Sequence, residues 1–151
     1  AWMLLRSLET LQIRMERQQA NAIKVAQFLD EHPMVERVYF LGEGGEVSDK
    51  SRQIYQEQCL GPGAMISFDI KGNEQIAFAF LNKLKLFKLA VSLGSTESLA
   101  EHPATMTHWS IPKEEREKNG IVDSLIRLSV GIEDIDDLTA DLKQALDKLA
   151  L

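Results

Sequence analysis

The sequence predicts an α+β fold: a small, mainly antiparallel sheet with helices packed on one face, preceded by a long helix. Three observations support this prediction. Residues 4–31 carry apolar side chains at helical spacing. Several short segments after residue 33 alternate apolar and polar side chains, as half-buried strands do. Helical patterns are interleaved with these segments, which favours a layer of helices against a sheet.

The long helix is expected over residues 4–31. Its apolar positions recur at steps of three, four or seven: Leu4, Leu8, Leu11, Met15, Ala22, Val25 and Leu29. The pair His32-Pro33 ends it, because a proline disfavours helix in the residue before it. We therefore treat residues 1–32 as one helical segment and residues 33–151 as the body of the fold.

Four strands are expected, at residues 35–41, 64–70, 87–93 and 125–130. In the third, Phe87, Leu89, Val91 and Leu93 share one face and Lys88, Ala90 and Ser92 share the other. In the fourth, Ile126, Leu128 and Val130 lie opposite Leu125, Arg127 and Ser129. The alternation thus places Arg127 and Ser92 away from the apolar faces of their strands.

Four further helices are expected, at residues 49–58, 74–85, 112–120 and 134–149. Pro112 suits a first helical turn, where its missing N–H costs little. Glu133, Asp134, Asp136 and Asp137 crowd the start of the last helix, where the helix dipole favours negative charge. Residues 94–111 show little periodicity and are expected to form a long functional loop.

Composition narrows the classes of function. The chain has 151 residues, which suits one domain or a large part of a bigger enzyme, and a net charge of −6. This charge argues against a nucleic-acid or anionic-membrane partner, and no apolar run reaches the roughly 18 residues of a membrane span. A single cysteine, Cys59, favours a reducing, cytoplasmic setting. His102, His108 and Cys59 do not form a metal-binding pattern, so no metal is expected.

Arg127 is the first candidate for a binding residue. Its neighbours are apolar, so the guanidinium is partly desolvated and requires an anionic partner. The planar fork of an arginine matches a carboxylate in a bidentate way. The alternative is that Arg127 pairs with an Asp or Glu of this same chain. Ser92 is the second candidate, on the same grounds of strand face.

Several ordered segments carry a family resemblance. They are residues 87–94 (FKLAVSLG), 97–99 (ESL), 102–108 (HPATMTH), 120–121 (GI) and 125–134 (LIRLSVGIED). Together they resemble the Cys/Met-metabolism family of enzymes that use pyridoxal phosphate (PLP), which includes methionine γ-lyase, homoserine sulfhydrylases, cystathionine lyases and cystathionine γ-synthase. Residues 5–11 with Arg14-Met15 resemble the interdomain helix of that family.

The resemblance implies a C-terminal domain of a fold type I PLP enzyme, with residues 1–32 as interdomain helix and residues 33–151 as substrate-binding domain. It implies that Arg127 grips the α-carboxylate of an amino-acid substrate, that Ser92 lies beside this carboxylate, and that Thr107 helps to orient the arginine. Val91 stands where the family varies with substrate, and its valine is similar to that of methionine γ-lyase and homoserine sulfhydrylases.

The resemblance also implies a parent enzyme that performs γ-elimination or γ-replacement and assembles as a homotetramer. PLP would be bound by an N-terminal domain, since no segment here matches the family's Schiff-base lysine segment and no cofactor-binding residue is expected in this chain. The 151 residues alone are therefore predicted to be inactive. Alternatives are a cystathionine γ-synthase or a cystathionine β- or γ-lyase, and, from another class, a free-standing, non-catalytic domain for amino-acid binding or assembly.

Overall fold

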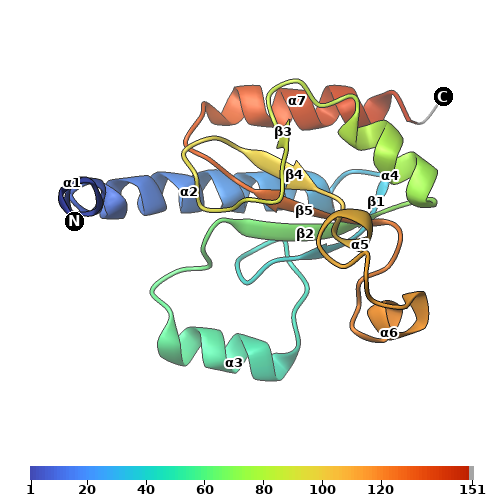
Figure 1. Ribbon diagram of the computed structural model, residues 1–151, viewed down its shortest axis with the longest axis horizontal. Coiled ribbons are helices and arrows are strands. Elements are labelled where there is room, and N and C mark those ends of the chain that lie inside the picture. The colour runs from blue at the N-terminus through green and yellow to red at the C-terminus, as the bar shows by residue number, and fades with distance from the viewer. Residues whose placement is uncertain (150–151) are drawn as a thin grey trace.

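The computed structural model describes residues 1–149 and has the expected α+β architecture, with a five-stranded sheet between two groups of helices (Figure 1). The helices are α1 (Trp2–Leu8), α2 (Leu11–Asp30), α3 (Asp49–Gln58), α4 (Glu74–Leu81), α5 (Pro103–Met106), α6 (Lys113–Lys118) and α7 (Ile135–Asp147). The strands are β1 (Val35–Tyr39), β2 (Met65–Ile70), β3 (Lys88–Leu89), β4 (Leu99–Glu101) and β5 (Leu125–Ser129).

The strand order is β1-β2-β5-β4-β3. The pairs β1–β2, β2–β5 and β4–β5 are antiparallel, and β3 pairs with β4 in parallel. The prediction of a mainly antiparallel sheet is therefore confirmed. The central position of β5 matters for the site, because both neighbours of this strand can place side chains beside Arg127.

One face of the sheet holds the hydrophobic core. Alternate residues of β2 and β5, among them Phe68 and Leu128, are fully buried there. Helices α2, α4 and α7 cover this face (Figure 1), and the ring of Phe80 from α4 meets Phe68 edge to face at 5.7 Å. Burial of each such side chain contributes roughly 1.5–3 kcal/mol. The opposite face, which we call the open face, carries the polar residues of the same strands.

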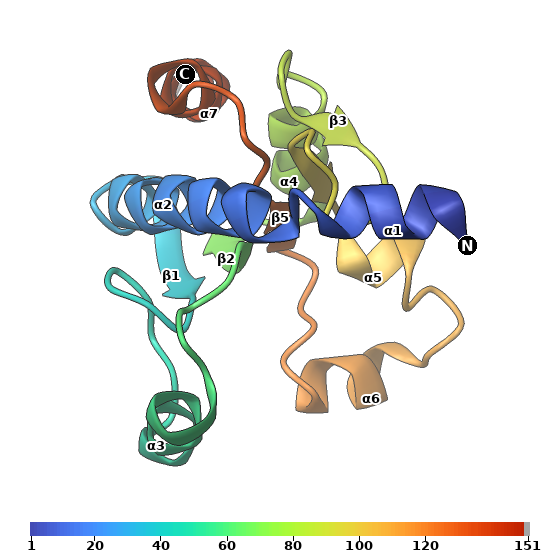
Figure 2. The ribbon, with the colours of Figure 1, turned by 90° about the vertical axis from the view of Figure 1, so that its left-hand side faces the viewer.

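The predicted helix over residues 4–31 is wrong as one continuous element. It breaks at Glu9–Thr10 into α1 and α2, and Figure 1 shows α1 end on where α2 lies lengthwise. Thr10 leaves the helical region at φ −109°, ψ 5°, and the Arg14 side chain donates to the Ser7 carbonyl across the break. No residue of α1 is buried, so side-chain packing among the described residues gives α1 little support. Figure 2 shows α1 from the side.

The predicted strand at 87–93 and the predicted loop at 94–111 are both corrected. The strand is limited to β3, and Leu89, Val91 and Leu93 are exposed rather than on a buried face. The segment lies at the edge of the sheet and pairs with β4 over two residue pairs only, so the regular backbone pairing ends at Ala90. The expected loop contains β4 and α5. These short elements lack a detectable period, which is why the sequence does not reveal them.

A buried carboxylate holds the segment that leads into β3. Asp141 of α7 accepts hydrogen bonds from the backbone N–H groups of Lys85, Leu86 and Phe87, at 2.8–3.1 Å. Farther along, the Gly94 N–H donates to the Ser129 hydroxyl at 2.9 Å. The segment that carries Val91 and Ser92 is thus anchored at both ends, to α7 and to β5.

Candidate functional site

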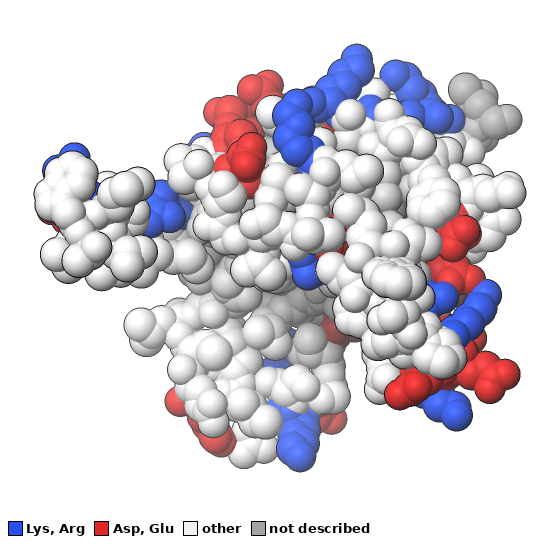
Figure 3. Space-filling view, viewed as in Figure 1, with Lys and Arg blue, Asp and Glu red and all other residues white. Residues whose placement is uncertain are grey.

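Four side chains form a row across the open face of the sheet. The register pairs Tyr39 with Ser67, Ser67 with Arg127, and Arg127 with Glu101. Because paired residues point to the same face, the row crosses β1, β2, β5 and β4 on the side away from the core. Figure 3 shows the molecular surface hollowed on this side, between the parts formed by α3 and by α6.

Arg127 is held at two of its nitrogens by two different segments. Nη1 lies 3.0 Å from Oε1 of Glu101, and Nη2 donates to the Val91 carbonyl at 2.9 Å. The ion pair that the sequence left open as an alternative is therefore present. It does not enclose the arginine, since 23% of the Arg127 side chain stays accessible. The remaining N–H donors of the guanidinium are free for a further acceptor.

Glu101 is the buried member of the pair, with only 1% of its side chain accessible. Burial raises the pKa of the Glu101 carboxyl, and the positive charge of Arg127 and the hydroxyl of Thr107 oppose this shift. Its second oxygen, Oε2, is buried without a hydrogen-bond partner. A buried oxygen without a hydrogen-bond partner lowers stability. The contact of the other oxygen, Oε1, with Arg127 offsets this cost.

Thr107 reaches the arginine through Glu101. Its hydroxyl lies 3.5 Å from Glu101 Oε1, donates to the Pro103 carbonyl, and lies 2.8 Å from Nδ1 of His108. The family resemblance implies that Thr107 orients Arg127. Within the described residues the Thr107 hydroxyl does not contact Arg127 directly, so any orienting effect passes through the Glu101 carboxylate.

Val91 and Ser92 lie in the bend after β3, and both are exposed. The main chain of Val91 contacts Arg127, whereas its side chain is free and 50% exposed. Ser92 is the next residue along the chain, directly after the carbonyl that Arg127 contacts. The structure thus brings Arg127, Val91, Ser92 and Thr107 to one region, around a residue that the sequence analysis did not single out.

That residue is Glu101. Sequence analysis missed it because residues 94–111 were expected to form a loop, where no strand face can be assigned. Leu99 and Glu101 share one face of this strand and Ala100 faces the other way, so the three residues do not alternate apolar and polar side chains and give no usable signal.

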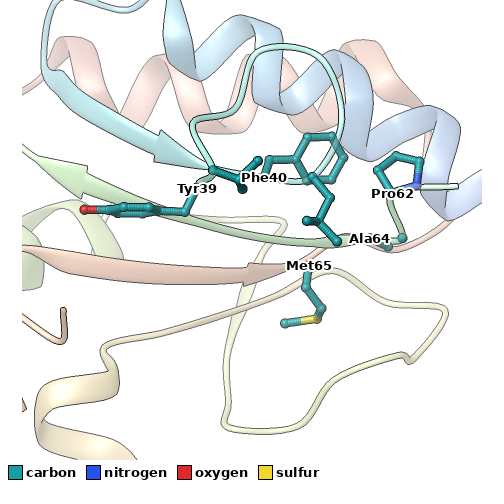
Figure 4. A pocket seen from close by; sticks show the side chains of 8 residues that line it. Tyr39, Phe40, Pro62, Ala64 and Met65 are labelled. Carbon is teal, nitrogen blue, oxygen red and sulfur yellow. The ribbon is translucent and has the colours of Figure 1, made fainter. Parts of the chain in front are cut away.

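A second hollow lies at the ends of β1 and β2 and encloses about 390 Å³. Figure 4 shows Phe40 directed towards Pro62, and Met65 on the other side of β2. Apart from the Tyr39 hydroxyl, its lining side chains are apolar. It offers no cationic group for a carboxylate. Nor do residues 1–149 contain a cluster of three or more His, Cys, Asp or Glu side chains that could hold a metal, or a helix long and apolar enough to cross a membrane.

The described lysines do not fit a covalent PLP site. A Schiff-base lysine has to be partly desolvated to keep its amine nucleophilic. Here every lysine is exposed except Lys83, which is half-buried and belongs to the turn after α4. The polar row on the open face contains no lysine. The polar row therefore offers hydrogen-bond donors and acceptors to a ligand but no amine for a Schiff base.

Comparisons with known proteins agree on one family. The profile described as "Cys/Met metabolism PLP-dependent enzyme" matches residues 1–147. An L-methionine gamma-lyase of Fusobacterium nucleatum subsp. polymorphum is 49% identical over 149 residues, which are 99% of this chain and 37% of that protein. A cystathionine gamma-lyase of Dictyostelium discoideum is 52% identical over 147 residues, which are 97% of this chain and 37% of that protein.

Solved structures agree as well. The cystathionine gamma synthase of Xanthomonas oryzae pv. oryzae, solved in complex with aminoacrylate and cysteine, matches with a TM-score of 0.88 and 43% identity over 97% of this chain and 37% of that one. The cystathionine gamma-lyase of Lactobacillus plantarum, complexed with L-serine, matches with a TM-score of 0.88 and 42% sequence identity. This match covers 99% of this chain and 38% of that one. The chain thus spans little more than a third of the relatives that it matches.

Proposed function

Because the chain belongs to the Cys/Met-metabolism family of PLP-dependent enzymes, we propose that it is the C-terminal, substrate-binding part of an enzyme that performs γ-elimination or γ-replacement on a sulfur amino acid. Its role would be to bind the α-carboxylate of the substrate and to orient the substrate for chemistry carried out elsewhere in the protein. Positioning of this kind accounts for a large share of catalysis.

The observation that carries the proposal is the state of Arg127. Its guanidinium is anchored at two nitrogens, remains 23% exposed, and faces the side of the sheet away from the core. A fixed, partly desolvated guanidinium with free N–H donors suits bidentate binding of a carboxylate. Ser92, in the exposed bend beside it, would donate a hydrogen bond to the same carboxylate.

PLP would be held by the part of the protein that this chain does not span, because the lysines described above do not fit its covalent site. The cofactor supplies the electron sink for elimination and replacement chemistry. We place the interdomain helix at residues 1–32 and the substrate-binding domain at residues 33–151. The exposed apolar side chains of α1 support this division, since they need cover from another part of the protein. A homotetramer and a cytoplasmic location belong to the same proposal.

Methionine, homocysteine or an activated homoserine is the proposed substrate class. The names of relatives support it, since they include L-methionine gamma-lyase and cystathionine gamma-lyase. The exposed side chain of Val91 would contact the distal part of the substrate, and an apolar side chain there suits a thioether. The alternative is that cystathionine is the substrate, as in a cystathionine β- or γ-lyase, or the product, as in a cystathionine γ-synthase; enzymes of all three kinds occur among the relatives.

The test uses the full-length protein loaded with PLP. Product analysis with methionine, cystathionine and acylated homoserine identifies the reaction. Arg127→Met should then lower kcat/KM by roughly 10²-fold, because a lost charge-assisted contact costs about 2–3 kcal/mol. Arg37→Met is the matched control, since Arg37 lies on the same face of the sheet but pairs with Glu46 at the surface.

An unchanged kcat/KM in Arg127→Met would exclude the role. The lack of a suitable lysine in residues 1–149 keeps one further candidate open, a free-standing domain that binds amino acids or serves assembly without catalysis. Titration of the 151-residue chain with an amino acid separates these two roles. Binding would favour an amino-acid-binding domain, and no binding would favour a role in assembly. A cofactor lysine in the complete reading frame would favour the enzyme.

A further inference from the structure

We propose that Glu101 is a positioning residue for Arg127 and that it acts through the acceptor oxygen Oε1, not through its negative charge. The inference deepens the proposed function and rests on it for its consequence in binding. It concerns a buried side chain that would not touch the substrate itself.

The contacts around Arg127 show how the guanidinium is oriented. Glu101 lies directly opposite Arg127 in the antiparallel register of β4 and β5, and its Oε1 lies 3.0 Å from Nη1. Nη2 donates a hydrogen bond to the Val91 carbonyl, 2.9 Å away, which belongs to another segment. A planar group held at two nitrogens by two separate segments cannot turn about its last side-chain bonds. The remaining N–H donors therefore point in one direction, which lowers the entropy cost of binding a carboxylate.

The environment of Oε2 indicates that Glu101 acts on Arg127 as a hydrogen-bond acceptor and not through its negative charge. Oε2 of Glu101 is buried and has no hydrogen-bond partner, although a stable buried carboxylate usually has partners for both oxygens. A full negative charge beside Arg127 would also offset the attraction of the guanidinium for an incoming carboxylate. Glutamine would keep an oxygen at the position of Oε1 and remove the negative charge.

Three substitutions test the inference: Glu101→Gln, which keeps the acceptor, Glu101→Leu, which removes it, and Glu101→Ala as a smaller replacement in case leucine disturbs folding. The control is Asp69→Leu, since Asp69 is also buried on the open face with one orphaned oxygen but bonds to Tyr39. Circular dichroism of each variant reports folding.

The first readout is the ¹⁵N–¹H spectrum of the Arg127 guanidinium in the 151-residue chain. A fixed group gives separate Nη–H signals, and a rotating group gives averaged ones. We expect separate signals in wild type, Glu101→Gln and Asp69→Leu, and averaged signals in Glu101→Leu and Glu101→Ala. Averaging in Glu101→Gln would overturn the acceptor role, and separate signals in Glu101→Leu and Glu101→Ala would overturn positioning altogether.

The second readout is the Kd of glycine, which carries the α-carboxylate and no leaving group, for the full-length protein with PLP. Glu101→Gln should stay within about threefold of wild type and Glu101→Leu should bind about tenfold more weakly, as loss of one charge-assisted hydrogen bond predicts. If Arg127→Met weakens binding and Glu101→Leu does not, positioning fails and the proposed function stands. If the leucine variant frees the guanidinium but neither it nor Arg127→Met changes the Kd, the proposed function fails.

Discussion

Arg127 and Glu101 face each other across β5 and β4, with Nη1 and Oε1 3.0 Å apart, and the two differ sharply in accessibility. The carboxylate is 1% accessible and the guanidinium 23%. The pair therefore has a buried end that belongs to the fold and a partly open end that is available to a ligand. Each half can be removed separately, which makes the pair open to a thermodynamic test.

Removal of Arg127 alone should destabilise the chain by about 2 kcal/mol near neutral pH, since it leaves a buried charge without a partner. It also raises the pKa of Glu101 further, because the arginine opposes the effect of burial. The folded state then binds a proton that the unfolded state lacks, so the loss of stability should grow as pH rises. Urea denaturation of Arg127→Met between about pH 4 and 7 measures this.

The double variant Arg127→Met/Glu101→Leu supplies the control. Replacement of both partners by apolar side chains should recover most of the lost free energy of unfolding and remove its added pH dependence. Equal stabilities of the single and double variants would mean that the Glu101 carboxylate tolerates the loss of Arg127.

Asp69 should contribute a pH dependence of its own. Burial raises the pKa of its carboxyl, and the nearby charge of Glu36 adds to this, while the Tyr39 hydroxyl opposes it. Between the ordinary Asp pKa and the raised one, the folded state binds more protons than the unfolded state. Stability therefore falls as pH rises through this window. Asp69→Asn should abolish that fall in pH-dependent urea denaturation while keeping an acceptor for Tyr39.

The contrasting variant is Asp123→Asn. Hydrogen bonds from Lys113 and then Arg116 lower the pKa of Asp123, although partial burial acts against them. Its contribution to stability is thus present at neutral pH and is lost as pH falls through the lowered pKa. The two variants should change the pH profile in opposite directions, and a shared direction would refute the assignment for Asp69.

Asp141 should be important for stability although it is remote from the site. It accepts three consecutive backbone N–H groups, from Lys85 to Phe87, and is 6% exposed. Asp141→Ala leaves these donors without their acceptor and should cost about 2–4 kcal/mol. Asp137→Ala is the matched control, because Asp137 is exposed on the same helix and should change the free energy of unfolding by no more than the roughly 1 kcal/mol of a helix-dipole contribution.

Val91 offers a test of substrate choice. Its side chain is 50% exposed beside the Arg127 anchor. Val91→Glu would place a carboxylate where the distal ammonium of cystathionine could reach it, whereas methionine has no such charge. In the full-length protein we expect the ratio of kcat/KM for cystathionine over methionine to rise about tenfold. Val91→Gln controls for size, and an equal change in both variants would point to shape instead of charge.

Much of the fold follows from the sequence alone, for local reasons. The alternation in Met65–Ile70 and Leu125–Ser129 places Phe68 and Leu128 in the core and Arg127 on the other face, as the structure has them. The acidic start of α7 and its apolar stripe predict that helix to within two residues at each end. These features depend on a repeat within one segment, so they can be recognised without knowledge of any partner.

Tertiary structure decided what surrounds Arg127. The sequence indicates that the arginine needs an anion, but only the pairing of β4 with β5 selects Glu101, 26 residues earlier in the chain, as that partner. The bend after β3 likewise brings the Val91 carbonyl to Nη2. Contacts between distant short segments leave no period in either segment. A three-residue strand and an edge bend thus escape sequence analysis, although they hold the candidate site together.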